Sequence, residues 1–247
     1  LMLTAEQLFQ QLCQINPKEF YQLSTSTFTQ WLTDSDSPMA IYLRQISIIL
    51  PAKVDTIIEG TIDSELRLLA AVPNDALLTT FGKQLHANEC FYQQPCIDQQ
   101  SYETGTFSAM QNHPLFTLLC TLGITGRYVC RLLYLAEKIT ELSGNELSNK
   151  SVIEPMTGQK WLEKNTSLAW VQTARGLLVH LANIQQEINN QYFIVAPTEW
   201  NFHPKGSLEN ILLHSVFKSP EHAKQAVKLA VIALDPCVDF NVGITYA

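Results

Sequence analysis

Hydrophobic residues recur at helical spacing through residues 4–49. The positions that carry this pattern are Leu8, Leu12, Phe20, Leu23, Phe28 and Leu32. Asn16-Pro17 and Ser37-Pro38 interrupt it, because proline cannot continue a helix from the preceding turn. The sequence therefore predicts a series of short helices in this part of the chain.

The pattern changes between residues 51 and 73, where β-branched and apolar residues cluster in two runs, 54–62 and 66–72. A polar turn separates the runs, so we expect a β-hairpin. Residues 74–108 are mixed and rich in turn residues.

An almost unbroken helical pattern extends over residues 114–142, and Pro114 suits the first turn of a helix. Gly123 and Gly126 lie within this pattern, although each costs about 1 kcal/mol relative to alanine in a helix. We expect a neighbouring element to approach the backbone closely at these glycines.

Residues 164–198 have the pattern of a β-meander, with apolar runs at 167–173, 176–184 and 192–196 and a polar turn at 185–190. Helical signals then return. Ser207 is expected to cap one short helix, and Ser219 with Pro220 to open another that reaches Leu234. Asp235-Pro236 should end that helix. The predicted fold is α+β, predominantly helical, with a small antiparallel β-meander.

Composition narrows the classes of function. The 247 residues are 46% hydrophobic and only 16% charged, so the chain can bury a substantial core. The net charge of −7 argues against nucleic acid or an anionic membrane as a partner. The six cysteines have no regular spacing, which does not indicate a disulfide framework. With no signal-peptide pattern and no apolar stretch that could span a bilayer, the expected location is the cytoplasm.

Three segments combine backbone-restricting residues with charged or metal-capable side chains: residues 173–176, 196–204 and 234–237. Taken singly they have ordinary explanations, since Arg175 suits a surface ion pair and Trp200 suits a core. Cys237 follows a predicted helix C-terminus, whose partial negative charge disfavours a thiolate. Metal coordination deprotonates a thiol regardless of the dipole, so this position favours a metal ligand over a free nucleophile.

Taken together and in this order, the segments resemble the C-terminal half of the large subunit of nickel-iron hydrogenases. They are more similar still to HupK/HoxV-type hydrogenase expression/formation proteins, whose pattern includes Ala-Pro-Thr-Glu-Trp-Asn-Phe-His-Pro and Leu-Asp-Pro-Cys. Glu103-Thr104-Gly105 and Gly126-Arg127 also fit. The resemblance covers roughly residues 100–243. It divides the chain into residues 1–100, helices and a hairpin with no assigned function, and residues 101–247, a large-subunit-like region with a truncated fold.

The resemblance implies roles for five residues. Arg175 and Asp235 would lie over a metal site, Pro197 and Thr198 would contact a cyanide ligand of iron, and Cys237 would bind the metal. A cyanide nitrogen accepts hydrogen bonds, for which a guanidinium and a hydroxyl are suitable donors. A soft thiolate suits low-spin iron or nickel.

The sequence also departs from the large-subunit pattern. A nickel-iron site uses four cysteines in two CxxC pairs, but Phe240 stands where the second C-terminal cysteine belongs, and Cys90 and Cys96 adjoin no matching motif. Ala174 replaces the usual proline, and no histidine follows Cys237. The chain is therefore not expected to be an enzyme, because too few thiolates remain to hold the bimetallic centre.

The family implies a non-catalytic scaffold or chaperone in nickel-iron hydrogenase maturation. It would bind an iron-cyanide-carbonyl fragment transiently, with no other cofactor, and its partners would be maturation chaperones and the hydrogenase large-subunit precursor. One alternative is a metal-free interaction protein with a degenerate large-subunit fold. Another is a thiol- or metal-dependent hydrolase that uses Cys237, His180 and His203. We also expect Arg175 and Asp235 to form a partly buried ion pair, whose disruption would cost about 3 to 5 kcal/mol.

Overall fold

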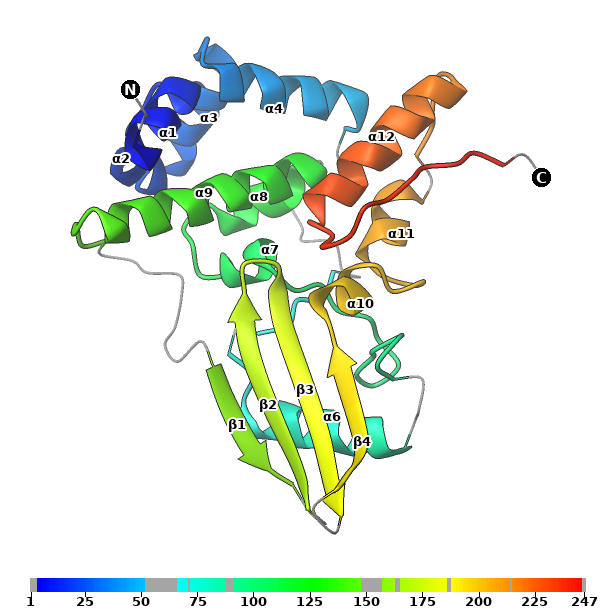
Figure 1. Cartoon of the computed structure of the whole chain (residues 1–247). Coiled ribbons are helices and arrows are strands. Elements are labelled where there is room, and N and C mark those ends of the chain that lie inside the picture. Colours follow the sequence, from blue (N-terminus) through cyan, green and yellow to red (C-terminus); the bar gives the residue numbers. More distant parts are fainter. Residues whose placement is uncertain are drawn as a thin grey trace.

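The computed structural model describes residues 4–51, 66–70, 72–87, 91–147, 157–162, 165–185, 188–213 and 215–245. A group of helices lies at one end of the molecule and a four-stranded antiparallel sheet at the other (Figure 1). The predicted α+β, predominantly helical class is confirmed. The division of the chain near residue 100 stays a prediction.

Four helices occupy the N-terminal part: α1 (Ala5–Cys13), α2 (Pro17–Tyr21), α3 (Thr25–Asp34) and α4 (Pro38–Ile49). The predicted breaks are helix N-caps, since the side chains of Asn16 and Ser37 accept hydrogen bonds from backbone N–H groups of α2 and α4. The series of short helices is therefore confirmed. The hairpin predicted for residues 51–73 falls mostly outside the described residues, and within them Leu68 forms a parallel bridge with Glu103.

Helix α6 (Asp75–Ala87) lies in the stretch interpreted as mixed and turn-rich, so that interpretation was wrong there. The Asn74 side chain accepts a hydrogen bond from the N–H of Leu77, which satisfies one donor of the first turn. Gly82 lies against Leu162, and a Cβ atom there would come within 2.3 Å of Leu162 Cδ1. The glycine that weakens the helical signal thus lets the Leu162 side chain pack closely against the backbone of α6.

The single helix expected over residues 114–142 is two helices, α8 (Phe116–Thr121) and α9 (Ile124–Leu142). The chain turns at Gly123, whose φ of +56° is unfavourable for residues with a side chain. A Cβ atom on Gly126 would lie 1.9 Å from the carbonyl oxygen of Leu119. The expected close backbone approach is therefore confirmed at Gly126, and it lets α8 and α9 pack together after the short helix α7 (Thr106–Ala109).

The meander is confirmed and is extended by one strand. Its strands pair in sequence order as β1 (Thr157–Trp161), β2 (Thr166–Thr173), β3 (Gly176–Gln185) and β4 (Ile188–Val195). The predicted turn at 185–190 is shorter than expected, because β3 continues to Gln185 and β4 begins at Ile188. One face of the sheet packs with α6 in a core that includes Leu168, Trp170, Val179, Leu181 and Trp200.

Three helices follow the sheet: α10 (Pro197–Asn201), α11 (Ser207–Leu212) and α12 (Pro220–Ala233). Ser219 caps α12 as predicted, through a hydrogen bond from the N–H of His222. Ser207 is the first residue of α11 and Gly206 is its N-cap, so the predicted cap was one residue late. In the part of the chain that the structure describes, no helix is long and apolar enough to cross a membrane.

Candidate functional site

The tight turn between β2 and β3 carries Arg175. The Thr173 hydroxyl donates to the Gly176 carbonyl at 2.9 Å and accepts from the Arg175 N–H at 3.2 Å. Gly176 has a φ of +130°, and a Cβ atom there would lie 2.7 Å from Thr104 Oγ1. The turn therefore rests on residues 104–105, and glycine is needed both for the conformation and for the contact.

Helix α10 supplies the second segment. Pro197 occupies its first turn, where a missing N–H has no cost, and Thr198 follows directly. Asn201 ends the helix, and its buried amide accepts from the Thr104 N–H at 2.8 Å while it donates to the Leu234 carbonyl at 3.3 Å. One side chain thus fixes α10 to residues 103–105 and to the end of α12. Asn201 belongs to the Ala-Pro-Thr-Glu-Trp-Asn-Phe-His-Pro motif, which by itself does not indicate this role.

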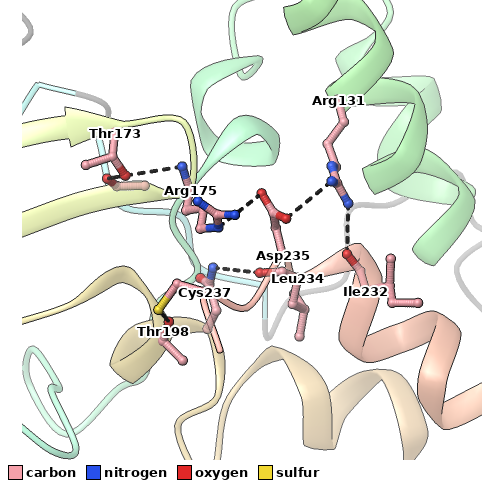
Figure 2. Close-up of polar contacts among 10 residues, drawn as sticks. Arg131, Thr173, Arg175, Thr198, Ile232, Leu234, Asp235 and Cys237 are labelled. Carbon is pink, nitrogen blue, oxygen red and sulfur yellow. Dashed lines mark hydrogen bonds and ion pairs between the residues drawn. The ribbon is translucent and has the colours of Figure 1, made fainter. Parts of the chain in front are cut away.

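The third segment begins where α12 ends. Leu234 is the C-cap, and Asp235 adopts a left-handed conformation with a φ of +53°, which aspartate tolerates better than most residues. This reversal turns the chain toward α10, and the Cys237 sulfur lies 3.3 Å from the Thr198 hydroxyl oxygen (Figure 2). The Cys237 side chain is exposed to solvent.

Asp235 lies between two arginines (Figure 2). Its Oδ1 atom is 3.2 Å from Nη2 of Arg131, and its Oδ2 atom is 3.9 Å from Nε of Arg175. Arg131 also donates to the Ile232 carbonyl at 2.8 Å, so it holds the end of α12 against α9. The sequence alone does not indicate this role for Arg131, because an arginine on the exposed side of a helix is common.

The expected meeting of Arg175 and Asp235 is confirmed, but its expected energy was wrong. The Arg175 side chain is 50% exposed and that of Asp235 is 30% exposed. At this separation and exposure, water screens the charges, and such pairs typically contribute no more than about 1 kcal/mol. The estimate of about 3 to 5 kcal/mol applies to buried pairs.

A buried pair does lie beneath the site. Arg127 on α9 donates from Nε and Nη2 to the Glu103 carboxylate at 2.9 and 2.7 Å, and the two side chains are 8% and 2% exposed. The Arg127 guanidinium also lies 4.6 Å from the centre of the Phe107 ring. Burial alone would lower the pKa of Arg127, but the charge and the hydrogen bonds of Glu103, with smaller contributions from Cys130 and Cys120, together raise that pKa and keep the guanidinium protonated. The pair fixes residues 103–105 on α9.

The structure brings together four of the five predicted site residues through two contacts, Thr198 with Cys237 and Arg175 with Asp235, and Pro197 begins the helix that carries Thr198. Among the described residues, no such contact supports the hydrolase alternative, which would need His180 or His203 next to Cys237. His180 is hydrogen bonded to the Tyr192 hydroxyl on the sheet, and the His203 ring accepts from the N–H of Lys205. Among the hydrogen bonds of the described residues, none joins either imidazole to Cys237.

Cys237 differs from the other described cysteines. Cys13, Cys120 and Cys130 are buried, and burial raises the pKa of the Cys13 thiol to about 12 and that of the Cys120 thiol to about 11. Cys96 is partly exposed, and Cys90 lies outside the described residues. Within the described ranges, no group of three or more His, Cys, Asp or Glu side chains could hold a metal ion. The site therefore offers a metal one sulfur, with the Thr198 hydroxyl 3.3 Å from it and the Arg175 guanidinium next to Asp235, two residues before Cys237.

Residues 103–242 match the model of the nickel-dependent hydrogenase family, and the chain belongs to this family. The match begins at Glu103 and extends past Cys237, so it includes the three site segments. It confirms the resemblance to nickel-iron hydrogenases that the motifs carry.

Among similar proteins is the hydrogenase expression/formation protein HoxV of Cupriavidus necator, which is 38% identical over 85 residues, 33% of this chain and 22% of the relative. The expression/formation protein HupK of Rhizobium leguminosarum bv. viciae is 39% identical over 82 residues, 31% of this chain and 21% of the relative. The uptake hydrogenase large subunit of Rhodobacter capsulatus is 27% identical over 140 residues, 51% of this chain and 23% of the relative. The matched regions thus span about a fifth of the length of these curated relatives. The resemblance to HupK/HoxV-type proteins is confirmed.

Among solved structures, the [NiFeSe] hydrogenase of Desulfovibrio vulgaris Hildenborough aligns with a TM-score of 0.40 and 18% identity, over 58% of this chain and 36% of that chain.

Proposed function

We propose that this chain acts in nickel-iron hydrogenase maturation as a non-catalytic scaffold that holds an iron-cyanide-carbonyl fragment and passes it to the large subunit. The observation that carries the proposal is the 3.3 Å contact between the exposed Cys237 sulfur and the Thr198 hydroxyl, with Arg175 on the adjoining turn. The names of the HoxV and HupK relatives, which are hydrogenase expression/formation proteins, support the same function.

The donor set fits this cargo. A thiolate from Cys237 is a soft ligand suited to iron that carries cyanide and carbonyl. The Thr198 hydroxyl and the Arg175 guanidinium are donors that a cyanide nitrogen can accept from, and the exposure of Arg175 leaves its terminal nitrogens available. Pro197 would restrict the backbone at the start of the helix that presents Thr198.

The same donor set argues for transfer rather than for hydrogen oxidation. Phe240 occupies the position of a second C-terminal cysteine, so among the described residues the site offers one sulfur, where a nickel-iron centre needs four. A fragment bound through one protein sulfur on an exposed segment is easier to release than one enclosed by several. The proposed partners are the large-subunit precursor, which would receive the fragment, and the maturation chaperones that would deliver it.

Infrared spectroscopy tests the proposal directly. The chain is co-expressed with the hydrogenase maturation machinery and purified without oxygen, and we expect cyanide and carbonyl stretching bands. Cys237→Ala should abolish the bands, and Thr198→Val should shift the cyanide bands because it removes one hydrogen-bond donor. Cys96→Ala is the matched control and should leave them unchanged. Bands that persist in Cys237→Ala, or their absence from the unmodified chain, would overturn the proposal.

A second candidate is a metal-free interaction protein that binds a hydrogenase precursor or a maturation chaperone by shape. The small number of metal-capable side chains around Cys237 among the described residues favours it. It requires that Cys237→Ala leave hydrogenase maturation intact in cells, whereas the scaffold proposal requires that this substitution stop it.

A further inference from the structure

The segment that follows Cys237 has a strict two-residue alternation of apolar and polar side chains. Its apolar positions are Val238, Phe240, Val242 and Ile244, and its polar or small positions are Asp239, Asn241, Gly243 and Thr245. A period of two places all apolar side chains on one side of an extended chain and is typical of a β-strand with one buried face. We call residues 238–245 the alternating segment.

The alternating segment has no strand partner within the described structure. It leaves the end of α12 as an extended trace, clear of the four-stranded sheet (Figure 1). Among the described residues, no backbone group of residues 236–245 is hydrogen bonded to another backbone group. A row of unpaired N–H and C=O groups is the feature by which one strand adds to the edge of a sheet.

The apolar side of the segment is only partly covered. Val238 is 62% exposed, Ile244 is 41% exposed and Phe240 is 37% exposed. A shallow hollow of about 250 Å³ lies between the start of the segment and the end of α12, and it is lined by Ile232, Asp235, Pro236, Val238, Asp239 and Phe240. The segment therefore combines an unpaired backbone with an apolar surface that adjoins Asp235.

We propose that the alternating segment is a donor strand, which pairs with an open sheet edge of the protein that receives the cargo of this chain. The required partner presents unpaired backbone groups on one strand and an apolar surface beside it, which the four apolar side chains cover. A segment that binds in a helical groove has apolar residues three and four positions apart, whereas those of this segment are two apart. A segment that binds an anionic membrane carries basic residues, whereas the charged residue of this segment is Asp239.

The alternating segment directly follows Cys237, so strand pairing would bring the partner close to the candidate site. This step rests on the proposed function. Strands advance about 3.3 Å per residue and paired strands lie about 4.8 Å apart, so a partner strand paired with Asp239 lies about 8 Å from the Cys237 backbone. Docking through residues 238–245 would thus bring the receiving protein next to the sulfur that holds the fragment.

Hydrogen exchange with residue-level mass spectrometry tests the inference, and the purified hydrogenase large-subunit precursor is the probe. In the free chain the amides of residues 238–245 should exchange without protection. In the complex every second amide should be protected, because an edge strand pairs through one side only.

Two substitutions at the exposed Asn241 separate pairing from side-chain contact. Proline is tolerated in an edge strand only where its nitrogen faces away from the partner, so Asn241→Pro should weaken binding of the precursor at least tenfold when exchange shows the Asn241 amide to be among the protected ones. The matched control, Asn241→Ala, should change the affinity less than twofold. Phe240→Ser should also weaken binding at least tenfold. All three variants should keep the melting temperature of the parent, which shows that the fold is intact.

Three results would overturn the inference. If the protected amides lie elsewhere, or if Asn241→Pro binds as tightly as the parent although the Asn241 amide is protected, the partner docks on another surface while the proposed function stands. If Asn241→Pro instead abolishes a dimer of the free chain, measured by light scattering, the segment pairs with a second copy. If no complex forms, the donor strand is wrong, and the infrared bands decide the proposed function separately.

Discussion

Nη2 of Arg131 lies 3.2 Å from Oδ1 of Asp235, and the same guanidinium donates to the carbonyl of Ile232 at 2.8 Å. The first contact reaches the residue that reverses the chain, and the second reaches the last turn of α12. Arg131 therefore connects α9 with the segment that carries Cys237, although 104 residues separate it from Asp235 in the sequence. It acts on the site through Asp235 and is a positioning residue.

Arg131→Gln should lower the free energy of unfolding by up to about 1 kcal/mol, because the ion pair with Asp235 is partly exposed. Arg175→Gln should cost less, since its contact with Asp235 is longer and its side chain is half exposed. Urea unfolding of the single and double variants with Asp235→Asn gives the coupling energies. A larger coupling for Arg175 than for Arg131 would contradict this ranking.

Glu103→Gln should destabilise the protein by about 3 to 5 kcal/mol, because it leaves the buried Arg127 charge without its carboxylate. The measurement is the midpoint of urea unfolding. Replacing both residues with apolar ones of similar size, Glu103→Leu with Arg127→Met, should recover part of the loss. A single substitution that costs less than 1 kcal/mol would show that the pair is solvated.

Gly126→Ala should be strongly destabilising, since the new Cβ atom would lie 1.9 Å from the Leu119 carbonyl oxygen and α8 would have to move away from α9. The control is Gly243→Ala, because a Cβ atom there meets nothing within 4 Å. Thermal unfolding should show a loss for the first variant and a change within about 0.5 kcal/mol for the second. Equal melting temperatures would mean that the two helices do not approach as described.

Stability should fall on acidification through His113. This ring is buried, its Nδ1 accepts from the Leu115 N–H at 3.2 Å, and its Nε2 lies 3.0 Å from the Tyr21 carbonyl, which fixes the neutral tautomer. Burial lowers its pKa below the ordinary 6.5, and the bond to Tyr21 offsets only part of that. Below pH 6.5 the unfolded chain therefore binds more protons, so the contribution of His113 is present above this pH and is lost as pH falls through the folded pKa.

The His113 contribution is measured as the free energy of unfolding between pH 7.5 and pH 5, in the parent chain and in His113→Gln. Each unit by which the pKa is lowered adds about 1.4 kcal/mol to the loss. The variant should be less stable at pH 7.5 but should show a shallower fall toward pH 5. An unchanged slope would assign the pH dependence to other groups.

Cys237 should react with iodoacetamide faster than the other described cysteines. Its sulfur is exposed, whereas burial shields Cys13, Cys120 and Cys130 and raises the pKa of their thiols. Peptide mass spectrometry after brief labelling of the native chain reads each site separately, and Cys237→Ser is the control. Modification of Cys13 or Cys130 at a similar rate would contradict their burial.

Several elements could be predicted because their signals are local. Proline after serine or asparagine marked the starts of α2, α4 and α12, and apolar runs separated by polar residues marked the last three strands. Helix α6 was missed because Gly82 and the polar residues Thr79 and Thr80 dilute its pattern, while its packing against Leu162 depends on distant residues. The break before α9 was missed because a glycine with positive φ cannot be distinguished by sequence from a glycine inside a helix.

The candidate site shows the same difference between local signals, which the sequence reveals, and contacts between distant residues, which it does not. The motifs gave the residues that meet, Thr198 with Cys237 and Arg175 with Asp235. They did not give Arg131 or the role of Asn201, whose contacts join residues far apart in the sequence. The energy assigned to the Arg175 pair also failed, because exposure is a property of the folded surface.

Asn201 connects the site segments through groups of the protein alone. Its bonds to Thr104 and Leu234, like the Glu103–Arg127 pair, contain no sulfur. The positions of these segments therefore depend on polar contacts that do not involve Cys237, so replacing its thiol should leave the surrounding framework in place.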